Sequence, residues 1–422
     1  MSRFLIHGGR PLKGRVRASG RKNAAVALLP AALLAEGPVR LENVPDIADV
    51  HTYVDILEAV GVDVRRPEPG VVEVDASSLA GRPAPYELVK KMRASYYLLG
   101  ALLARTGRAE VALPGGCDIG TRPIDQHIKA FQALGADVTI EHGVVRAEAA
   151  RLRGARIYLD IVSVGATINA MLAASRAEGT TIIENAAKEP HVVDVAILLN
   201  AMGGRVVGAG TDVIKVTGVP RLGAAEHTVI PDEIEAATYL MAAAGTRGDV
   251  VVEGVVTKHL EPVIAKLHEA GAQVEYDADW IRVRADGRLR AVSVKTLPYP
   301  GFPTDAQQPM TALLSTAEGT STVTETIHEA RFRHVDELKR MGTRIRVEGR
   351  TAVIEGVERL SGAPVQATDL RAGAALVVAG LMADGCTEVS GVEYLDRGYE
   401  RMEEKLRTLG ARIERVEAAV TA

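Results

Sequence analysis

Hydrophobic and polar positions along the chain follow a short pattern that recurs six times. In each copy, two apolar residues three positions apart are followed at once by glycine, and a β-branched residue comes three positions later. The copies cover residues 57–64, 131–138, 199–206, 267–274, 338–345 and 406–413. Their glycines recur every 68 to 74 residues, which predicts a chain built from six related units.

Each copy predicts a helix that ends at the glycine and leads directly into a strand, because glycine adopts the left-handed conformation of a helix cap at little cost. A second helix end lies upstream in each unit, for example at Gly179 and Gly319, and a strand-like run follows it. Helices and strands that alternate in this way are typical of α/β proteins. Six units favour two domains of three units each, with a boundary near the Gly- and Pro-rich residues 217–231.

Polar residues occupy the expected start of the first helix in every unit. They are Lys22, Arg93, Ser163, Asp232, Asp305, and Asp369 with Arg371. Helix N-termini bind anions through free N–H groups and the helix dipole, so these positions are candidates for a ligand site. For Ser163, Asp232 and Asp369 the alternative is a simple N-cap. Lys22 and Arg93 oppose the helix dipole, which favours a bound phosphate or carboxylate beside them.

Two arginines share one offset from the repeated glycines. Arg122 precedes Gly135 by 13 residues, and Arg397 precedes Gly410 by 13 residues. The planar guanidinium group suits a bidentate grip on phosphate or carboxylate. The matching placement therefore favours a shared ligand over two unrelated surface ion pairs.

The two cysteines of the chain lie in contrasting surroundings. Cys117 lies in the glycine-rich segment PGGCDIG, close in sequence to Arg122 and His127, which favours a reactive thiol in catalysis. Redox sensing is the alternative for this residue. Cys386 lies in a strand-like apolar run, so we expect it to be a buried, inert residue.

The composition of the 422 residues is that of an ordinary globular protein, with 47% hydrophobic and 25% charged residues. A formal net charge of −4 argues against a nucleic-acid-binding protein. The chain shows no signal-peptide pattern, no apolar run of membrane-spanning length and only two cysteines, so we expect a cytoplasmic protein without membrane attachment. No histidine and carboxylate cluster has metal-ligand spacing, so we expect no metal and no other cofactor.

Nine motifs spread over the whole chain carry a family resemblance. They are SGRKNAA (19–25), KMRASYY (91–97), PGGCDIGTRPID (114–125), SVGAT (163–167), ENAAKEPHVVD (184–194), FPTD (302–305), ARFRHVDEL (330–338), ATDLRA (367–372) and DRGYER (396–401). With these motifs in this order, the chain resembles the UDP-N-acetylglucosamine 1-carboxyvinyltransferase family of enolpyruvyl transferases. The resemblance implies a monomer with an inside-out α/β barrel fold of two domains, each with three βαβαββ repeats. Residues 21–230 would form the first domain, and residues 1–20 with 231–422 the second.

The resemblance also implies a reaction, the first committed step of peptidoglycan synthesis. The enolpyruvyl group of phosphoenolpyruvate passes to the 3-hydroxyl of UDP-N-acetylglucosamine, and phosphate is released, by addition and elimination through a tetrahedral ketal. This chemistry needs an acid toward the methylene carbon and a base toward the sugar hydroxyl. The resemblance gives the acid role to Cys117, which is also the expected target of fosfomycin, and the base role to Asp305.

The other site residues follow from the same resemblance. Phosphoenolpyruvate would be held by Lys22, Arg122 and Arg397, with Asn23, Arg331 and Arg371 nearby. The fixed charges of Lys22 and Arg397 would also stabilise the intermediate. The sugar nucleotide would be held by Arg93, Arg122, Pro123, Ile124, Asp125, Gln126, Ser163, Val164, Asp305 and Ile327. It would bind first, and closure of the two domains would complete the phosphoenolpyruvate site.

Two positions depart from the family pattern, because Ile161 stands where many members have lysine and Glu233 where they have arginine. The first change would weaken binding of the sugar nucleotide at its uridine end. Two alternative functions stay open. One is that of the related family that makes 5-enolpyruvylshikimate 3-phosphate, which lacks the cysteine segment. The other is a non-catalytic ring or clamp, against which the basic residues at the helix starts argue.

Overall fold

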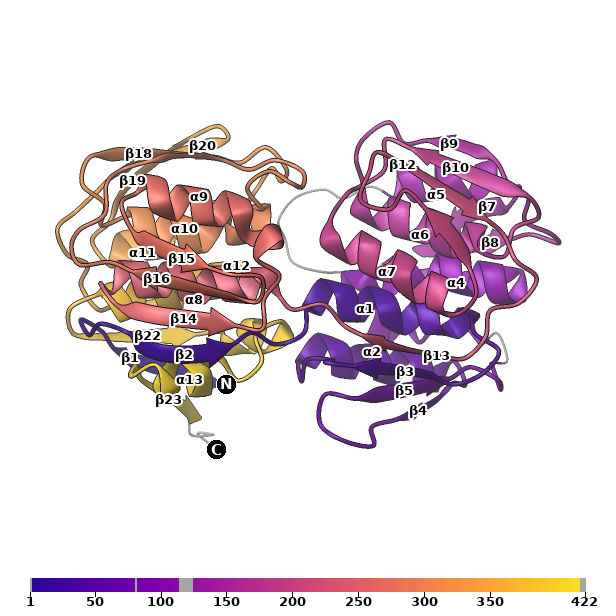
Figure 1. The fold of residues 1–422 in the computed structure, drawn as a ribbon, viewed down its shortest axis with the longest axis horizontal. Coiled ribbons are helices and arrows are strands. Elements are labelled where there is room, and N and C mark those ends of the chain that lie inside the picture. The colour runs from indigo at the N-terminus through magenta and orange to yellow at the C-terminus, as the bar shows by residue number, and fades with distance from the viewer. Residues whose placement is uncertain (1, 80–81, 114–123, 418–422) are drawn as a thin grey trace. The chain divides into compact units, whose positions relative to one another are not determined.

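The computed structural model describes residues 2–79, 82–113 and 124–417, which form two compact units (Figure 1). We call residues 20–113 and 124–230 the N-terminal unit, and residues 2–19 and 231–417 the C-terminal unit. Each unit has its own hydrophobic core, made almost entirely of aliphatic side chains.

The C-terminal unit contains three sheets of four strands. The strands are β1 (Ser2–His7), β2 (Lys13–Arg17), β14 (Asp249–Glu253), β15 (Gln273–Tyr276), β16 (Trp280–Arg284), β17 (Ser293–Lys295), β18 (Thr320–Thr324), β19 (Arg344–Glu348), β20 (Thr351–Glu355), β21 (Pro364–Gln366), β22 (Cys386–Ser390) and β23 (Arg412–Glu417). In the order β17-β18-β20-β19, the first pair is parallel and the other pairs are antiparallel. The orders β2-β14-β16-β15 and β21-β22-β1-β23 repeat this pattern, so the N-terminal strands complete two sheets of this unit.

Three helices form the centre of the C-terminal unit and pack against one another: α8 (Glu233–Gly245), α10 (Gln307–Leu314) and α12 (Leu370–Met382). They are buried on almost every side, as expected for helices rich in alanine and other apolar residues. Figure 1 shows β18 and β22 on opposite sides of this helical layer. The shorter helical segments are η3 (Thr257–Leu260), α9 (Glu261–Glu269), η4 (Thr304–Ala306), α11 (His334–Arg340), η5 (Val392–Arg397) and α13 (Met402–Thr408).

The N-terminal unit has the same plan. Its strands are β3 (Val39–Glu42), β4 (Asp63–Arg65), β5 (Val72–Asp75), β6 (Arg108–Ala112), β7 (Asp137–Glu141), β8 (Val144–Glu148), β9 (Arg156–Tyr158), β10 (Thr180–Glu184), β11 (Arg205–Val207), β12 (Val213–Thr217) and β13 (Ala225–Thr228). The orders β13-β3-β5-β4 and β9-β10-β12-β11 again combine one parallel pair with antiparallel pairs. The sheet β6-β8-β7 is antiparallel over its three described strands.

Buried helices also fill the centre of the N-terminal unit, where α4 (Tyr97–Thr106) packs against both α1 (Lys22–Ala31) and α6 (Val164–Ala174). The other helical segments are η1 (Ala32–Leu34), α2 (Ala48–Ala59), α3 (Tyr86–Val89), η2 (Arg93–Tyr96), α5 (Asp125–Ala133) and α7 (Pro190–Ala201). Like those of the C-terminal unit, the central helices begin at the polar residues that the sequence singled out.

The six repeated glycines occupy the predicted position between a helix and a strand. All six have a positive φ, between 88° and 97°, and they follow α2, α5, α7, α9, α11 and α13 in turn. Around Gly135 and Gly203 nothing lies within 4 Å of where a Cβ atom would be. The backbone conformation, and not lack of space, is therefore what requires glycine here.

The predicted α/β class with repeated helix–strand units is confirmed. The described strands form six separate mixed or antiparallel sheets, and no closed barrel is present among them. The prediction of a buried Cys386 is wrong, since this residue is exposed at the start of β22, where its side chain points away from the core. Within the described ranges, no helix is long and apolar enough to span a membrane.

Candidate active site

The polar residues predicted at helix starts lie there in both units. Lys22 begins α1, Arg93 begins the turn η2 that leads into α4, and Asp305 lies in the turn η4 that leads into α10. The remaining three are N-caps: Ser163 precedes α6, Asp232 precedes α8, and Asp369 precedes α12.

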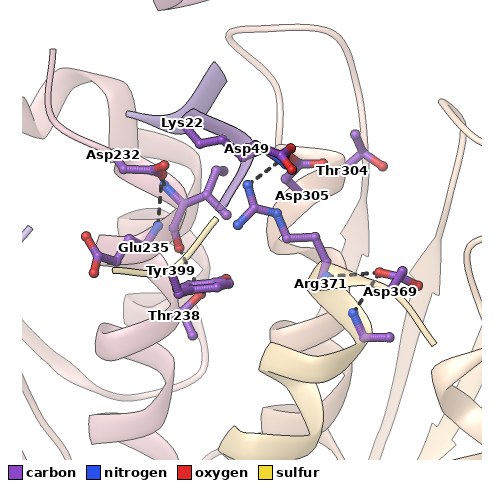
Figure 2. A network of polar contacts seen from close by, with 12 residues as sticks. Lys22, Asp49, Asp232, Glu235, Thr238, Thr304, Asp305, Asp369, Arg371 and Tyr399 are labelled. Atoms are coloured by element: carbon purple, nitrogen blue, oxygen red, sulfur yellow. Dashed lines mark hydrogen bonds and ion pairs between the residues drawn. The ribbon is translucent and has the colours of Figure 1, made fainter. Parts of the chain in front are cut away.

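The three N-cap side chains accept hydrogen bonds from backbone N–H groups of their own helices. Ser163 Oγ accepts from the N–H of Ala166 at 3.3 Å, and Asp369 Oδ1 accepts two such bonds at 2.9 Å. Asp232 Oδ1 likewise accepts two, at 2.8 and 3.0 Å (Figure 2). The capping interpretation therefore holds for all three, and it accounts for these residue types without a ligand.

Asp305 lies between two buried arginines in the C-terminal unit. Its Oδ1 accepts from Nη2 of Arg331 at 2.7 Å, and its Oδ2 accepts from Nη2 of Arg371 at 3.1 Å. Only 5% and 4% of the two arginine side chains are exposed, against 25% of the Asp305 side chain. The Asp305 side chain is thus partly exposed, while the arginines that hold it are not.

These arginines set the charge state of Asp305. Burial raises the pKa of this carboxyl group, but the charges of Arg371 and Arg331 lower it by more, so its pKa lies well below the ordinary value of 3.8. Asp305 is therefore ionised throughout the neutral range. An ionised carboxylate can accept a proton, which is what a general base requires.

Each of the three side-chain nitrogens of Arg331 donates a hydrogen bond to a protein group. Besides Nη2 to Asp305, its Nη1 donates to Oγ1 of Thr304 at 2.9 Å. With the Gln308 amide oriented to satisfy both of its neighbours, Gln308 accepts from Nε of Arg331 at 2.7 Å. This arginine therefore serves to hold the turn that carries Asp305.

Arg371 differs, because one of its buried nitrogens has no hydrogen-bond partner among the described residues. Its Nη2 donates to Asp305, whereas its Nη1 is buried and lacks such a partner. The guanidinium lies over the ring of Tyr399, 5.4 Å from the centroid, and the Tyr399 hydroxyl lies 2.9 Å from Oγ1 of Thr238. Burial lowers the pKa of Arg371, but Tyr399 and Asp305 raise it by more, so it stays charged. An unpaired buried donor is costly, which points to an anionic ligand at this position.

Three more predicted residues lie in the C-terminal unit. Arg397 is half-buried at the end of η5. The backbone N–H of Ile327 donates to Oε1 of Glu325 at 2.7 Å. Glu233, one of the two departures from the family pattern, is the buried first residue of α8, where the helix dipole favours a carboxylate.

Lys22 of the N-terminal unit has a protein partner. Its Nζ lies 2.7 Å from Oδ2 of Asp49, and both side chains are largely buried (Figure 2). The cation at this helix start is therefore balanced in part by Asp49 of α2, which the sequence analysis did not single out. Asn23 follows on α1 and is half-buried.

Arg93, in the same unit, belongs to a cluster of aromatic and imidazole rings. Its guanidinium lies over the Tyr96 ring, 5.8 Å from the centroid, and the Tyr96 and His127 rings are 5.7 Å apart. Burial first, and then the charge of Arg93, lower the pKa of His127 to about 4. Nδ2 of Asn169 donates to Nδ1 of His127 at 2.9 Å. Neutral His127 therefore carries its proton on Nε2, which faces Gly165 at the start of α6.

One side-chain amide links the starts of α5 and α6. Nε2 of Gln126 donates to Asp125 at 2.9 Å and to Asp160 at 3.1 Å, while its Oε1 accepts from the N–H of Asp160 at 2.8 Å. Nζ of Lys129 lies 2.7 Å from the other oxygen of Asp160. Hydrogen bonds from Lys129 and Gln126 lower the pKa of Asp160. Asp160 and Lys129 were missed from the sequence, because neither occupies a helix start.

Ile161, the other departure from the family pattern, is exposed beside this network. Ile124 is buried just before α5, and Val164 is the half-buried first residue of α6. Cys117, Arg122 and Pro123 lie outside the described residues. Within 2–79, 82–113 and 124–417, no group of three or more His, Cys, Asp or Glu side chains could hold a metal ion.

Comparison with known proteins points to one enzyme family. The model of the EPSP synthase (3-phosphoshikimate 1-carboxyvinyltransferase) family matches residues 6–406. UDP-N-acetylglucosamine 1-carboxyvinyltransferase 3 of Caldanaerobacter subterraneus subsp. tengcongensis is 58% identical over 416 residues, covering 99% of this chain and 100% of the relative. UDP-N-acetylglucosamine 1-carboxyvinyltransferase 2 of Carboxydothermus hydrogenoformans is 57% identical over 418 residues, with the same coverage.

Two solved structures share the fold. The enolpyruvyl transferase NikO of Streptomyces tendae is 29% identical, with a TM-score of 0.89 and 99% of each chain covered. EPSP synthase of Acinetobacter baumannii is 21% identical, with a TM-score of 0.78, covering 99% of this chain and 100% of the other. At this identity the second likeness supports the α/β fold with mixed sheets.

Proposed function

Because the chain belongs to the UDP-N-acetylglucosamine 1-carboxyvinyltransferases, within the wider EPSP synthase family, we propose that it catalyses the reaction for which these relatives are named. It transfers the enolpyruvyl group of phosphoenolpyruvate to the 3-hydroxyl of UDP-N-acetylglucosamine and releases phosphate, as the first committed step of peptidoglycan synthesis. The observation that carries this proposal is the 58% identity over essentially the full length of both chains.

The geometry around Asp305 fits the base of this reaction. In the addition step, the sugar 3-hydroxyl loses its proton to Asp305 and bonds to C2 of phosphoenolpyruvate, while an acid protonates the C3 methylene. In the elimination step, a proton leaves C3 and the C2–O bond to phosphate breaks, which restores the double bond. The depressed pKa of Asp305 keeps it ionised before the first step, and its partial exposure lets a substrate reach it.

We assign the grip on phosphoenolpyruvate to Lys22, Arg122, Arg371 and Arg397, with Asn23 beside Lys22. The unpartnered Nη1 of Arg371 is the observation that supports this assignment best, because it supplies a buried, charged donor for a carboxylate or phosphate oxygen. Arg331 takes a different part, since its nitrogens already bind protein groups.

We assign the sugar nucleotide to Arg93, Arg122, Pro123, Ile124, Asp125, Gln126, Ser163, Val164, Asp305 and Ile327. Gln126 supports this set, because its amide joins the start of α5 to the segment before α6. The start of α6 offers backbone N–H groups and a helix dipole to a diphosphate.

Cys117 is the proposed acid toward the methylene carbon and the proposed target of fosfomycin, with redox sensing as the alternative role. A cysteine suits this step because its thiol can both give and take back a proton near neutral pH. We further propose that the two units are the two domains of an inside-out α/β barrel protein, and that the enzyme is a cytoplasmic monomer.

Incubation of the purified protein with both substrates tests the function. Release of inorganic phosphate, together with a product whose mass is that of UDP-N-acetylglucosamine plus an enolpyruvyl group, is the expected result. Shikimate 3-phosphate in place of the sugar nucleotide should release none. Phosphate release from phosphoenolpyruvate with shikimate 3-phosphate, but not with UDP-N-acetylglucosamine, would instead support the activity of the family that makes 5-enolpyruvylshikimate 3-phosphate.

A pair of cysteine variants tests the thiol. We expect Cys117→Ser to lose most turnover and all labelling by fosfomycin, while Cys386→Ser retains both. Because Cys386 is exposed, general thiol reagents would modify it as well, so labelling sites must be located by mass spectrometry. Unchanged labelling of Cys117→Ser would reject the assignment.

A further inference from the structure

Glu325 is a buried carboxylate for which the proposed reaction has so far no role. It follows β18 directly, only 1% of the residue is exposed, and its two oxygens accept four hydrogen bonds. Oε1 accepts from Oγ1 of Thr296 at 3.0 Å and from the backbone N–H groups of Ile327 at 2.7 Å and His328 at 3.0 Å. Oε2 accepts from Oγ1 of Thr304 at 2.8 Å.

The bond to Thr304 leads to the proposed base. A hydroxyl group has a single O–H donor, and that of Thr304 donates a hydrogen bond to Glu325. A lone pair on the same oxygen accepts from Nη1 of Arg331 at 2.9 Å. Nη2 of Arg331 in turn donates to Oδ1 of Asp305 at 2.7 Å. Glu325 therefore orients the Thr304 hydroxyl at the start of a chain of hydrogen bonds that ends on Asp305.

The bonds to Ile327 and His328 lead to a second part of the same site. They hold the turn that follows β18, and Ile327 in this turn is one of the residues assigned to the sugar nucleotide. Thr296 adds a third anchor at the end of the neighbouring strand β17, since its Oγ1 also accepts from the N–H of Thr326 at 2.9 Å. One carboxylate thus joins its own turn to Thr296 and Thr304, which lie 29 and 21 residues earlier in the sequence.

We propose that Glu325 is a positioning residue, which holds Asp305 toward the sugar hydroxyl through Thr304 and Arg331 and holds the Ile327 turn against the sugar nucleotide. It acts without touching a substrate. This inference rests on the proposed function of Asp305. It goes beyond that function by naming the residue that couples the base to the binding turn.

The chemistry of the site requires a carboxylate and not an amide. All four partners of Glu325 are donors, three at Oε1 and one at Oε2. Glutamine at this position would place its NH₂ group either against the N–H groups of Ile327 and His328, which cannot accept, or against Thr304. In the first orientation the bonds to the Ile327 turn are lost, and in the second the Thr304 hydroxyl can no longer donate to this position, at almost unchanged shape.

The test is Glu325→Gln, compared with wild type by steady-state kinetics across pH. We expect kcat to fall roughly tenfold or more, as for loss of a buried hydrogen bond to a charged group, and KM for UDP-N-acetylglucosamine to rise. Among the described residues, the charges of Arg371, Arg331 and His328 act on Asp305 and lower its pKa. If Arg331 moves away from Asp305, the pKa of Asp305 rises, so the acid limb of the kcat profile should move to higher pH.

Two variants of Thr304 separate the hydrogen bonds of Glu325 that lead to Asp305 from those that hold the Ile327 turn. Thr304→Val removes the relay to Arg331 but leaves the Ile327 turn bound, so it should reproduce the loss of kcat and the shifted acid limb without the change in KM. Thr304→Ser keeps the hydroxyl and should have the kcat, the KM and the acid limb of the wild type. Thermal unfolding of each variant gives the folded fraction, to which every kcat is normalised.

The outcomes are distinguishable. A wild type that releases no phosphate from phosphoenolpyruvate and UDP-N-acetylglucosamine overturns the proposed function itself. If the wild type is active, and Glu325→Gln and Thr304→Val have the same normalised kcat and the same acid limb as the wild type, only the positioning role is overturned. A loss of kcat that matches the loss of folded protein, with the pH profile unchanged, overturns it as well.

Discussion

The groups around Asp305 in the C-terminal unit and those around Asp160 in the N-terminal unit use similar chemistry at very different depths. Asp305 is held by two arginines whose side chains are almost fully buried, whereas Asp160 and its partner Lys129 are exposed by 58% and 42%. Charges interact strongly when they are removed from water and weakly when water and salt screen them. We therefore expect changes in the buried region to affect mainly the rate, and changes in the exposed region to affect mainly affinity.

The largest expected effect comes from removing the charge of the buried region. Asp305→Asn keeps the shape of the side chain but cannot take up the proton of the sugar hydroxyl, so kcat should fall by about 10²- to 10⁴-fold, the usual contribution of a general base. Steady-state phosphate release measures this loss. The variant should still bind UDP-N-acetylglucosamine in a thermal-shift assay. A kcat within a fewfold of wild type would show that another group is the base.

The next largest effect should separate the two arginines that hold Asp305. Arg371→Lys removes the unpartnered Nη1 donor, and the loss of one charged hydrogen bond corresponds to about 1.5–3 kcal/mol, so KM for phosphoenolpyruvate should rise by at least about tenfold. Arg331→Lys, the matched control, removes bonds to Thr304 and Gln308 instead, and should lower kcat with little change in this KM. Equal changes in KM for both variants would contradict the division of roles.

Sequence alone could predict the repeated architecture, because it depends on local signals. The six glycines that end helices need a positive φ, which the residue type itself reveals. The starts of the central helices were equally predictable, since capping side chains such as Asp232 and Asp369 follow local rules.

The partners that complete the site were not predictable from the sequence. Asp49 meets Lys22 from a different helix, and Glu325 reaches Thr304 across 21 residues. Such contacts depend on how strands and helices pack, which leaves no periodic pattern in the chain. The error at Cys386 has a related cause: an apolar run predicts a strand, but successive side chains of a strand point to opposite faces, and this one points outward.

The smallest expected effect tests the exposed region. Lys129→Met removes the ion pair with Asp160 next to the residues assigned to the sugar nucleotide. An exposed pair contributes little because water and salt screen it, so KM for UDP-N-acetylglucosamine should rise by no more than about fivefold, with kcat unchanged. The increase should shrink at high salt, because screening already weakens the pair in the wild type.

Lys266→Met provides the matched control for Lys129→Met, since Lys266 forms an exposed ion pair with Glu269 at 2.6 Å on α9, whose residues have no assigned part in the site. It should leave KM and kcat unchanged at every salt concentration. If Lys129→Met instead lowered kcat as strongly as a change at Asp305, charge at the surface of the N-terminal unit would matter to the chemical step. Depth of burial would then no longer explain why the two regions differ.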